Sequence, residues 1–558
     1  MEGRNLGFSP MESGAKGRDA RAVQWGGLEN HLPLVGSGGS NPPPAAMEYY
    51  LEVSRASDLK NKKERIVYRF FEILPAFLSW TTLISALFLS YFAPMAIGVF
   101  IILFDLYWLF RVAYLSFHQV SAFLKMRKNL KINWLSLAKE MEGFKEIFHL
   151  VCLPFYKEGP EIVESSLNAI LDSNYPKEKI IVVLAAEERG GEKTKKVAKE
   201  MEEKFSKKFY KFFVFFHPEN LPGEIQGKGA NVNFAVAKVK EKIKEIDFEN
   251  IIFSIFDVDT RPYPDYFAIV TYYYLKLKKE KNVCFQPIPV YNNNIWDAPS
   301  FSRVVATSNT FWQMMQQERP EQLVSYSSHS IPFKTLLEVG YPKNVVSDDS
   351  RIFWKLYLFK NGNFKVIPLF YPVSMDAVLG KNLWRTIINQ YKQQRRWAWG
   401  VENIPFLLFG FLKNKKIPIF EKIRHSFIIL EGFWSWAVTA ILIFLLGWLP
   451  VILGAEKLKL EKKAETLIFG YSLPKTTRNL MTIAALGMII CAILSLLMLP
   501  PLPKKSKFSK RASLFFQWLL LPITLIAFGS IPALDAQTRL MLGKYLGFWT
   551  TEKMRKNE

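Results

Sequence analysis

The sequence predicts a mostly parallel α/β domain inserted between two groups of membrane-spanning helices. Apolar runs of about 20 residues lie before residue 120 and after residue 425, and each is long enough to cross a bilayer. Between them, short apolar strands alternate with helical patterns, which is typical of a doubly wound sheet. The composition agrees, since 49% of the 558 residues are hydrophobic and 22% are charged.

The formal net charge of +23 has two explanations, a nucleic-acid partner or the positive flanks of membrane helices. Most of the excess Lys and Arg lies beside the apolar runs, whereas the charges of the middle region are mixed in sign. This distribution predicts a protein in contact with membrane lipid and no nucleic-acid partner. The three cysteines, Cys152, Cys284 and Cys491, form no CxxC pair, so we expect neither a disulfide framework nor a zinc site.

Residues 1–46 are rich in Gly, Ser and Pro and have no apolar period. This composition predicts a disordered N-terminal extension, and Met47 is an alternative start of the chain. Residues 47–135 are predicted to be a basic segment followed by a transmembrane hairpin.

The hairpin consists of apolar runs 73–92 and 96–117, separated by Ala93-Pro94. Basic residues flank the outer ends of both runs, which places those ends in the cytoplasm. Asp105 lies within the second run, where a carboxylate is costly and often functional. The alternative is a structural role, in which Asp105 has a partner such as Arg111 or faces the helix bundle. This structural interpretation is favoured.

Residues 136–380 form the predicted α/β domain. Short β-branched and aromatic runs predict buried strands, and the segments between them have helical spacing. The expected strands are 147–154, 180–186, 212–216 and 251–257, and the expected helices are 161–172, 192–208 and 230–243.

Residues 381–425 are predicted to be interfacial amphipathic helices, because the stretch 383–411 is amphipathic and carries three tryptophans. Residues 426–535 hold three further candidate spans, at about 427–452, 479–499 and 513–533. About five spans are therefore expected in all.

The C-terminal tail, 536–558, raises a conflict in topology. The basic run 503–511 is expected in the cytoplasm, and three crossings after residue 426 would leave the C-terminus outside. The tail is itself basic, with Lys553, Arg555 and Lys556. The topology after residue 512 therefore stays open.

The stretch Ile251–Thr260 is an apolar strand pattern that ends in Asp257-Val258-Asp259. Side chains alternate along a strand, so we expect both carboxylates to point into a crevice at its carboxyl end, where α/β sheets bind ligands. Two carboxylates suit Mg²⁺ or Mn²⁺, which usually takes further ligands from substrate phosphates. The alternative is a polar turn.

Other strand ends and helix starts carry compatible groups. Pro154, Tyr156 and Glu158 follow the first strand and Glu187 the second, where side chains can hold a base and ribose. Lys228 lies between two glycines at a helix start, where free backbone N–H groups favour a diphosphate. The alternative for Lys228 is a solvated charge beside a turn.

Two further motifs offer a base and an anion clamp. Asp348 and Asp349 precede a helical pattern, where carboxylates cap a helix or one acts as a general base. Gln393 and Arg396 lie three residues apart on one helix face, with Trp397 beside them. Arg suits phosphate, and the alternative is an anchoring helix in the membrane interface.

Together these motifs resemble those of membrane-integrated family 2 glycosyltransferases, which include cellulose and hyaluronan synthases. The motifs stand in the order of that family over roughly residues 70–555, with membrane segments before and after. They are Pro154-x-Tyr156-x-Glu158, Gly227-Lys228-Gly229, Asp257-Val258-Asp259, Ser347-Asp348-Asp349 and Gln393-x-x-Arg396-Trp397.

The resemblance implies a GT-A domain that uses a UDP-linked nucleotide-diphosphate sugar and Mg²⁺ or Mn²⁺. It assigns metal binding to Asp259 with Asp257, nucleotide-sugar contact to Asp257, and the role of catalytic base to Asp349. Gln393, Arg396 and Trp397 would hold the diphosphate and the acceptor, and a one-step displacement would invert the anomeric centre.

The chain departs from the family at several positions. Glu187 stands where the family usually has Asp, and Asp348 where it has Glu. His329 lies in what is usually a small-residue acceptor loop, where it contacts the acceptor or is a plain loop histidine. The stretch 548–553 faintly resembles the FxVTxK gating loop of cellulose synthase, with Thr551 and Lys553 in place.

The leading hypothesis is a membrane glycosyltransferase that extends a glycan, with its catalytic domain on the cytoplasmic side of the plasma membrane. A processive synthase and a transferase that adds one sugar to a lipid-linked acceptor both stay open. The alternative from another class is a non-catalytic membrane scaffold subunit, against which the intact acids Asp257, Asp259 and Asp349 argue.

Overall fold

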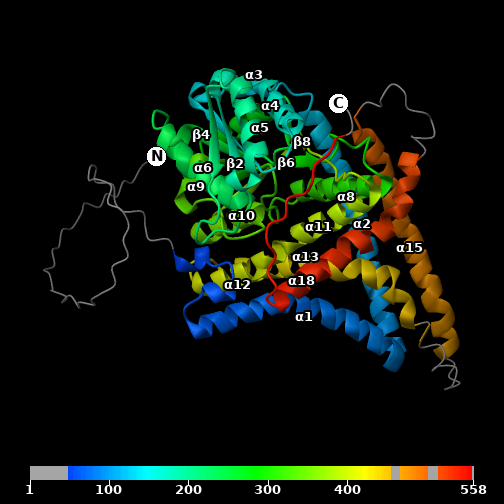
Figure 1. Cartoon of the computed structure of the whole chain (residues 1–558). Coiled ribbons are helices and arrows are strands. Elements are labelled where there is room, and N and C mark those ends of the chain that lie inside the picture. Colours follow the sequence, from blue (N-terminus) through cyan, green and yellow to red (C-terminus); the bar gives the residue numbers. More distant parts are fainter. Residues whose placement is uncertain (1–47, 451, 454–464, 501–512, 556–558) are drawn as a thin grey trace, which may run out of the picture. The chain divides into compact units, whose positions relative to one another are not determined.

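The computed structural model describes residues 48–450, 452–453, 465–500 and 513–555. The predicted N-terminal extension, Met47, the basic run 503–511 and Lys556 lie outside these residues. Within them, the chain order is two membrane-helix candidates, then an α/β domain, then three further candidates, as the sequence predicts (Figure 1).

The domain is built on one eight-stranded sheet of order β3-β2-β1-β4-β7-β6-β8-β5. The pairs β1·β2, β2·β3, β1·β4 and β6·β8 are parallel, and only the pairings of β7 and β5 are antiparallel. The mostly parallel, Rossmann-like sheet is confirmed. The strands are β1 Phe148–Phe155, β2 Ile180–Glu187, β3 Lys211–His217, β4 Ile251–Ile255, β5 Arg261–Pro262, β6 Val283–Val290, β7 Ser330–Pro332 and β8 Lys365–Ser374.

Alternate residues of the strands face two hydrophobic cores. One core packs Val151, Val182 and Ile252 against α4, α5 and α7, and the other packs Leu150, Ile181 and Phe253 against α6, α9 and α10. The helices of the domain are α3 Trp134–Lys139, α4 Pro160–Leu171, α5 Gly191–Phe205, α6 Lys228–Lys242, α7 Tyr266–Lys276, α8 Ser300–Gln317, α9 Phe333–Val339 and α10 Asp348–Phe359.

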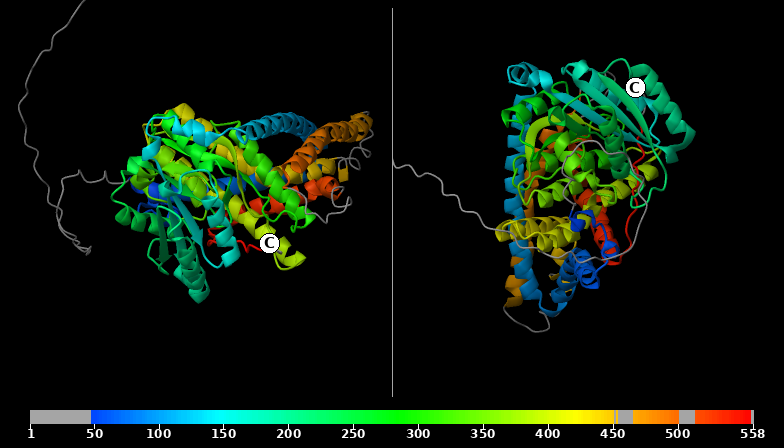
Figure 2. Two further views of the ribbon diagram at one scale, coloured as in Figure 1. Left: turned by 90° about the horizontal axis from the view of Figure 1, so that it is seen from above. Right: turned by 90° about the vertical axis from the view of Figure 1, so that its left-hand side faces the viewer.

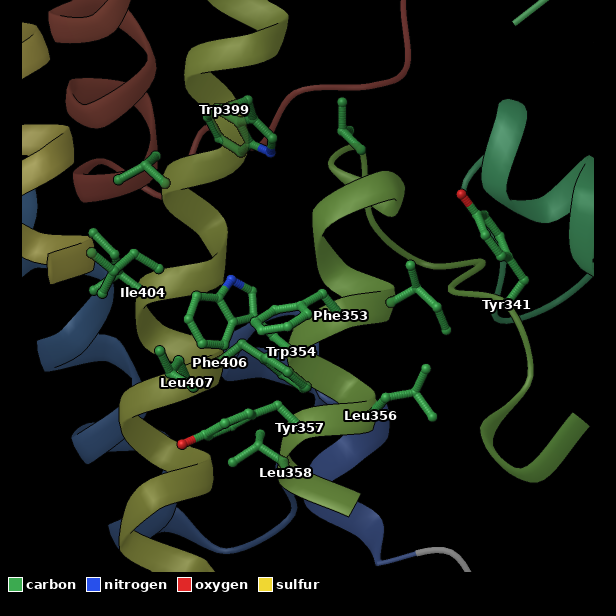
Figure 3. Packing of buried hydrophobic residues seen from close by; sticks show 14 of the residues in the cluster. Tyr341, Phe353, Trp354, Leu356, Tyr357, Leu358, Trp399, Ile404, Phe406 and Leu407 are labelled. Carbon is green, nitrogen blue, oxygen red and sulfur yellow. The ribbon is translucent and has the colours of Figure 1, made fainter. Parts of the chain in front are cut away.

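The second core continues from the domain into the membrane helices. Phe353, Trp354 and Tyr357 of α10 pack against Phe406 and Leu407 of α12 Asn403–Lys413 (Figure 3). The predicted amphipathic stretch 383–411 is there, but it is broken in two. Its parts are α11 Leu383–Ala398, a 3-10 turn Trp399–Glu402, and α12 Asn403–Lys413.

Among the residues that the structure describes, five helical segments are long and apolar enough to cross a membrane, which agrees with the predicted number. Four are continuous over most of their length, and α2 and α15 lie side by side (Figure 2). The last one, Ser513–Met541, changes its helix type several times. The segments are α1 Lys62–Phe92, α2 Pro94–Asn129, α13 Ile419–Phe444, α15 Glu465–Met498, and finally the 3-10 turn Gln517–Leu520, α17 Leu521–Leu525, the π-helical turn Ile526–Ser530 and α18 Ile531–Met541.

Candidate active site

The site lies where β2, β1 and β4 end, because their register brings these ends to one edge of the sheet. Cys152 of β1 pairs with Val183 of β2 and with Ile255 of β4. Tyr156, Glu187 and Asp259 each lie four residues beyond that level, since all three strands run parallel. Strands are spaced about 4.8 Å apart, so this edge spans roughly the length of a nucleoside diphosphate.

Asp257 and Asp259 leave the sheet in a turn. Strand β4 ends at Ile255, and the Thr260 N–H donates to the Asp257 carbonyl at 2.8 Å. The directions of the two carboxylates are therefore set by this turn, and the expected alternation along a strand is wrong. Both nevertheless lie beside ammonium groups, Asp257 beside Lys228 and Asp259 beside Lys553.

Lys228 lies between Asp257 and Asp349, the predicted base. Its Nζ lies 2.8 Å from Asp257 Oδ1 and 2.8 Å from each carboxylate oxygen of Asp349. Burial alone would lower the pKa of Lys228, but Asp257 and Asp349 outweigh it and hold the pKa above the ordinary value. Lys228 is therefore a buried, ion-paired side chain that joins three motifs, and the solvated-charge interpretation is wrong.

The glycines on either side of Lys228 allow this close packing. Gly227 has a φ of 154°, and a Cβ there would lie 2.5 Å from the Phe548 side chain. A Cβ at Gly229 would lie 2.3 Å from the Pro342 carbonyl oxygen. Both positions need glycine, because the backbone or the neighbouring chain leaves no room for a side chain.

Each acid bound to Lys228 has a second, hydroxyl partner. Ser327 Oγ donates to Asp257 Oδ2 at 2.7 Å, and Tyr341 OH donates to Asp349 Oδ1 at 3.2 Å. Burial tends to raise the pKa of Asp257, but the Lys228 and Lys553 ammonium groups hold it below the ordinary value. Ser327 and Tyr341 were not predicted, since single polar residues in loops carry no motif.

Asp348 and His329 are both buried at the site. Asp348 is 2% exposed, and its Oδ2 has no hydrogen-bond partner among the described residues. Burial and then the Asp349 charge raise its pKa. His329 is fully buried, its Nδ1 lies 2.8 Å from the Tyr326 carbonyl, and burial lowers its pKa.

The β1 and β2 end of the edge holds Tyr156 and Glu187. Glu158 Oε2 accepts from the N–H groups of Tyr156 and Lys157 at 2.8 and 3.1 Å and so closes the loop that follows Pro154. Glu187 is ion-paired with Arg189. The Arg189 guanidinium lies 4.1 Å from the centre of the Tyr156 ring, and its Nη2 has no hydrogen-bond partner among the described residues. Arg189 lies just outside the predicted motifs.

Helix α11 brings the predicted acceptor and anion residues to the same site. The Arg396 guanidinium lies 5.2 Å from the centre of the Phe548 ring. The rings of Trp397 and Tyr291 are 5.9 Å apart, and Gln393 is half-buried on the same helix. Tyr291 follows β6, a strand that the sequence analysis did not predict.

The C-terminal tail crosses the site, and the red trace in Figure 1 rises from α18 toward the domain. Lys553 is ion-paired with Asp259, and Arg555 Nη2 lies 2.9 Å from Asp376 Oδ1. Asn294 Nδ2 donates to the Met554 carbonyl at 3.0 Å. The tail therefore reaches Asp259 and Asp376 at the candidate site.

The carboxylates fit a divalent cation. Across the described residues, no group of three His, Cys, Asp or Glu side chains forms a metal cluster. Asp257 and Asp259 still suit Mg²⁺ or Mn²⁺, because such ions are often held by one or two carboxylates and completed by substrate phosphates. The Lys553 ammonium bound to Asp259 stands where such a cation would bind.

No protein-family model matches the sequence, and no curated protein matches it either. Several solved structures are similar at low identity. The mannosyltransferase PcManGT from Pyrobaculum calidifontis, in complex with GDP-Man and Mn2+, is 17% identical with a TM-score of 0.38, covering 71% of this chain and 99% of its own. S. aureus TarS 1–349 in complex with UDP-GlcNAc is 12% identical with a TM-score of 0.34, covering 72% and 93%.

GalNAc-T7 with UDP, GalNAc and Mn2+ is 10% identical with a TM-score of 0.28, covering 53% of this chain and 57% of its own. At these identities and TM-scores, the assignment of function rests on the chain's own residues.

Proposed function

We propose that this protein is a membrane-bound inverting glycosyltransferase of the family 2 type. It moves a hexose from a nucleotide-diphosphate sugar, UDP-linked by the resemblance of its motifs, to a glycan acceptor. The observation that most supports the proposal is the Lys228 ammonium at 2.8 Å from both Asp257 and Asp349, because a cation there suits a diphosphate beside the proposed donor-contacting acid and the proposed base.

The diphosphate of the donor would bind among cations. Lys228 lies at the start of α6, where backbone N–H groups also favour an anion, and Arg396 approaches from α11. Asp257 and Asp259 would hold Mg²⁺ or Mn²⁺, which when bound neutralises charge on the diphosphate. The base and ribose would lie toward Tyr156 and Glu187, along the same sheet edge.

Asp349 would act as the base. In this structure, both of its oxygens accept from Lys228, which occupies one lone pair on each oxygen. A bound diphosphate competes for the Lys228 donors, which releases Asp349 toward the acceptor hydroxyl.

The transfer step would then be a single displacement. The acceptor oxygen forms a bond to the anomeric carbon, the bond from that carbon to the diphosphate oxygen breaks, and the hydroxyl proton passes to Asp349. The electron pair leaves on the diphosphate, where Lys228 and Arg396 stabilise the charge. Trp397 and Tyr291 provide an aromatic surface for the acceptor sugar.

We place the catalytic domain on the cytoplasmic side of the plasma membrane. Basic residues flank α1 and α2 on the side of the domain, as the positive-inside bias predicts. A nucleotide sugar made in the cytoplasm then reaches the site directly.

The test is nucleotide release from purified membranes over a panel of nucleotide sugars, with and without Mg²⁺ or Mn²⁺. We expect metal-dependent turnover with one donor, and a loss of about 10²- to 10⁴-fold in Asp349→Asn with donor binding kept. Asp172→Asn, at the exposed end of α4, is the matched control and should keep full turnover.

Unchanged turnover in Asp349→Asn would remove that residue as the base. Nucleotide binding without turnover on any donor would favour the scaffold subunit. Chain-length analysis of the product separates repeated addition from single addition to a lipid-linked acceptor.

A further inference from the structure

We propose that Asp376 is a further ligand of the Mg²⁺ or Mn²⁺ ion that Asp257 and Asp259 are proposed to hold. This inference rests on the proposed function, in which that ion neutralises the diphosphate of the donor. Asp376 belongs to none of the sequence motifs, and only its place in the fold brings it to the site.

Asp376 lies opposite Asp259 because two antiparallel strands bring them together. Strand β5 pairs with β8 in a register that sets Arg261 against Ser374. In an antiparallel pair one strand runs forward while the other runs back, so the same register continued by two residues sets Asp259 against Asp376. The contact is direct, since the Asp376 N–H donates to Asp259 Oδ2 at 3.0 Å.

One asparagine side chain fixes the two acids relative to each other. Asn293 Nδ2 donates to the Asp259 carbonyl and to Asp376 Oδ1, both at 2.9 Å. The Asn293 N–H donates in turn to the Met375 carbonyl at 3.1 Å. Hydrogen bonds behind a metal ligand orient its carboxylate, and Asn293 is placed to do so for both acids.

The Asp376 carboxylate is buried and has one oxygen without a partner. The residue is 6% exposed, and among the described residues its Oδ2 has no hydrogen-bond partner. Buried carboxylates are normally paired, hydrogen-bonded or bound to a metal. A cation beside Asp259 would give this oxygen the partner that it lacks.

Two cations of the C-terminal tail mark the same place. Lys553 is ion-paired with Asp259, and two residues further along the tail Arg555 Nη2 lies 2.9 Å from Asp376 Oδ1. Burial tends to lower the pKa of Lys553, but three carboxylates hold it above its ordinary value. They are, in order of effect, Asp259, Asp257 and Asp376. One ammonium therefore interacts with all three acids, as a divalent cation in its place would.

A third carboxylate bears on when the metal binds. Where one or two carboxylates hold Mg²⁺ or Mn²⁺, substrate phosphates usually complete the set of ligands. Asp376 adds a ligand and a negative charge from the protein itself. The site would then bind Mn²⁺ before the nucleotide sugar arrives. The alternative is that Asp376 only anchors Arg555 and the tail.

The test measures Mn²⁺ affinity of the full chain in detergent, without donor, by electron paramagnetic resonance of the free ion. Lys553→Met and Arg555→Met are first combined, so that a lost anchor for the tail cannot change the result. In this background, Asp376→Asn removes the proposed ligand and Asp259→Asn removes its neighbour. Asp297→Asn, an exposed acid in the loop after β6, is the matched control. Unfolding midpoints show whether each variant keeps its fold.

We expect Asp376→Asn to weaken Mn²⁺ binding by at least about tenfold, since even the loss of an outer partner of a metal ligand typically costs about 10- to 100-fold. Asp297→Asn should change nothing. Unchanged affinity in Asp376→Asn beside weakened binding in Asp259→Asn would overturn the inference and leave the proposed function intact. No effect of either substitution would overturn both the inference and the metal site of the proposed function.

Asp376→Cys gives a second measurement, which a purely structural role would not move. A thiolate favours Zn²⁺ over the harder Mn²⁺. In the same background, Zn²⁺ should therefore displace Mn²⁺ from Asp376→Cys at a concentration at least about tenfold lower than from Asp297→Cys. Displacement at the same Zn²⁺ concentration in both variants would overturn the inference, also in the case that Asp376→Asn does not fold.

Discussion

The Lys228 ammonium lies 2.8 Å from each of the two carboxylate oxygens of Asp349. A neutral replacement of this buried cation would remove the ion-pair partner of two carboxylates, Asp349 and Asp257. Removing one partner of a buried ion pair typically costs about 3–5 kcal/mol. Lys228 therefore links the stability of the site to its chemistry.

We expect Lys228→Gln to lower turnover by at least about 100-fold, because the leaving diphosphate loses a positioned cation. Nucleotide release from membranes measures turnover, and a thermal unfolding curve measures stability. Lys240→Gln, at the exposed end of the same helix, should change neither. Turnover near that of the wild type in Lys228→Gln would show that Lys228 has a structural role only.

The tail makes a second prediction, about metal binding. The Lys553 ammonium is bound to Asp259 and competes with a divalent cation for the same carboxylate. We expect Lys553→Met to bind Mn²⁺ about tenfold more tightly in the absence of donor, since a difference of about 1.4 kcal/mol corresponds to tenfold. Titration of the protein with Mn²⁺, followed by electron paramagnetic resonance of the free ion, gives the dissociation constant.

Lys544→Met is the control for this experiment, because Lys544 is an exposed cation of the same tail. Equal Mn²⁺ affinity in Lys553→Met and in the wild type would mean that the tail does not compete with metal at Asp259.

The motifs predicted much of the site because the residues within each motif are neighbours in the sequence. Asp257, Lys228 and Asp349 all lie within one ion-paired cluster, although they are far apart in sequence. Strands β1 to β4 were predictable for the same reason, since each is a short apolar run, whereas the parallel pair β6 and β8 was not predicted. By contrast, β5 and β7 have two and three residues, too few to show a period.

The rest of the site depends on contacts between distant segments. Tyr341 reaches Asp349 from a loop, and Arg189 reaches Tyr156 across two strand ends. Hydropathy could not show that the segment Ser513–Met541 contacts α8, because the partners Arg303 and Gln517 lie far apart in sequence.

Asp348 gives a prediction about pH. Burial and the neighbouring Asp349 charge raise its pKa from 3.8 to about 8, so the folded state holds a proton that the unfolded state has released. The stabilising contribution of this proton is fully present below about pH 4 and is lost as the pH rises to about 8. Asp348→Asn keeps the shape of the protonated side chain and removes this dependence.

We therefore expect Asp348→Asn to gain thermal stability relative to the wild type as the pH rises from 5 to 8. Unfolding midpoints of the detergent-solubilised proteins at several pH values measure this difference. Asp172→Asn, a change of an exposed Asp, should show a constant difference. A constant difference in Asp348→Asn as well would mean that Asp348 is ionised in the folded protein.

The last prediction concerns Arg189, whose guanidinium lies over the Tyr156 ring and pairs with the buried Glu187. Its Nη2 has no hydrogen-bond partner among the described residues, at the sheet edge where the base of a donor would lie. A charge-assisted hydrogen bond contributes about 1.5–3 kcal/mol, so Arg189→Gln should weaken UDP binding by about tenfold or more. Glu187→Gln combined with Arg189→Gln leaves no unpaired charge and should weaken binding in the same way.

Lys157→Ala removes an exposed cation that also lies over the Tyr156 ring, 4.7 Å from its centre, and should leave the dissociation constant unchanged in calorimetry. Equal weakening in Lys157→Ala and Arg189→Gln would point to the general charge of this region and not to a specific contact.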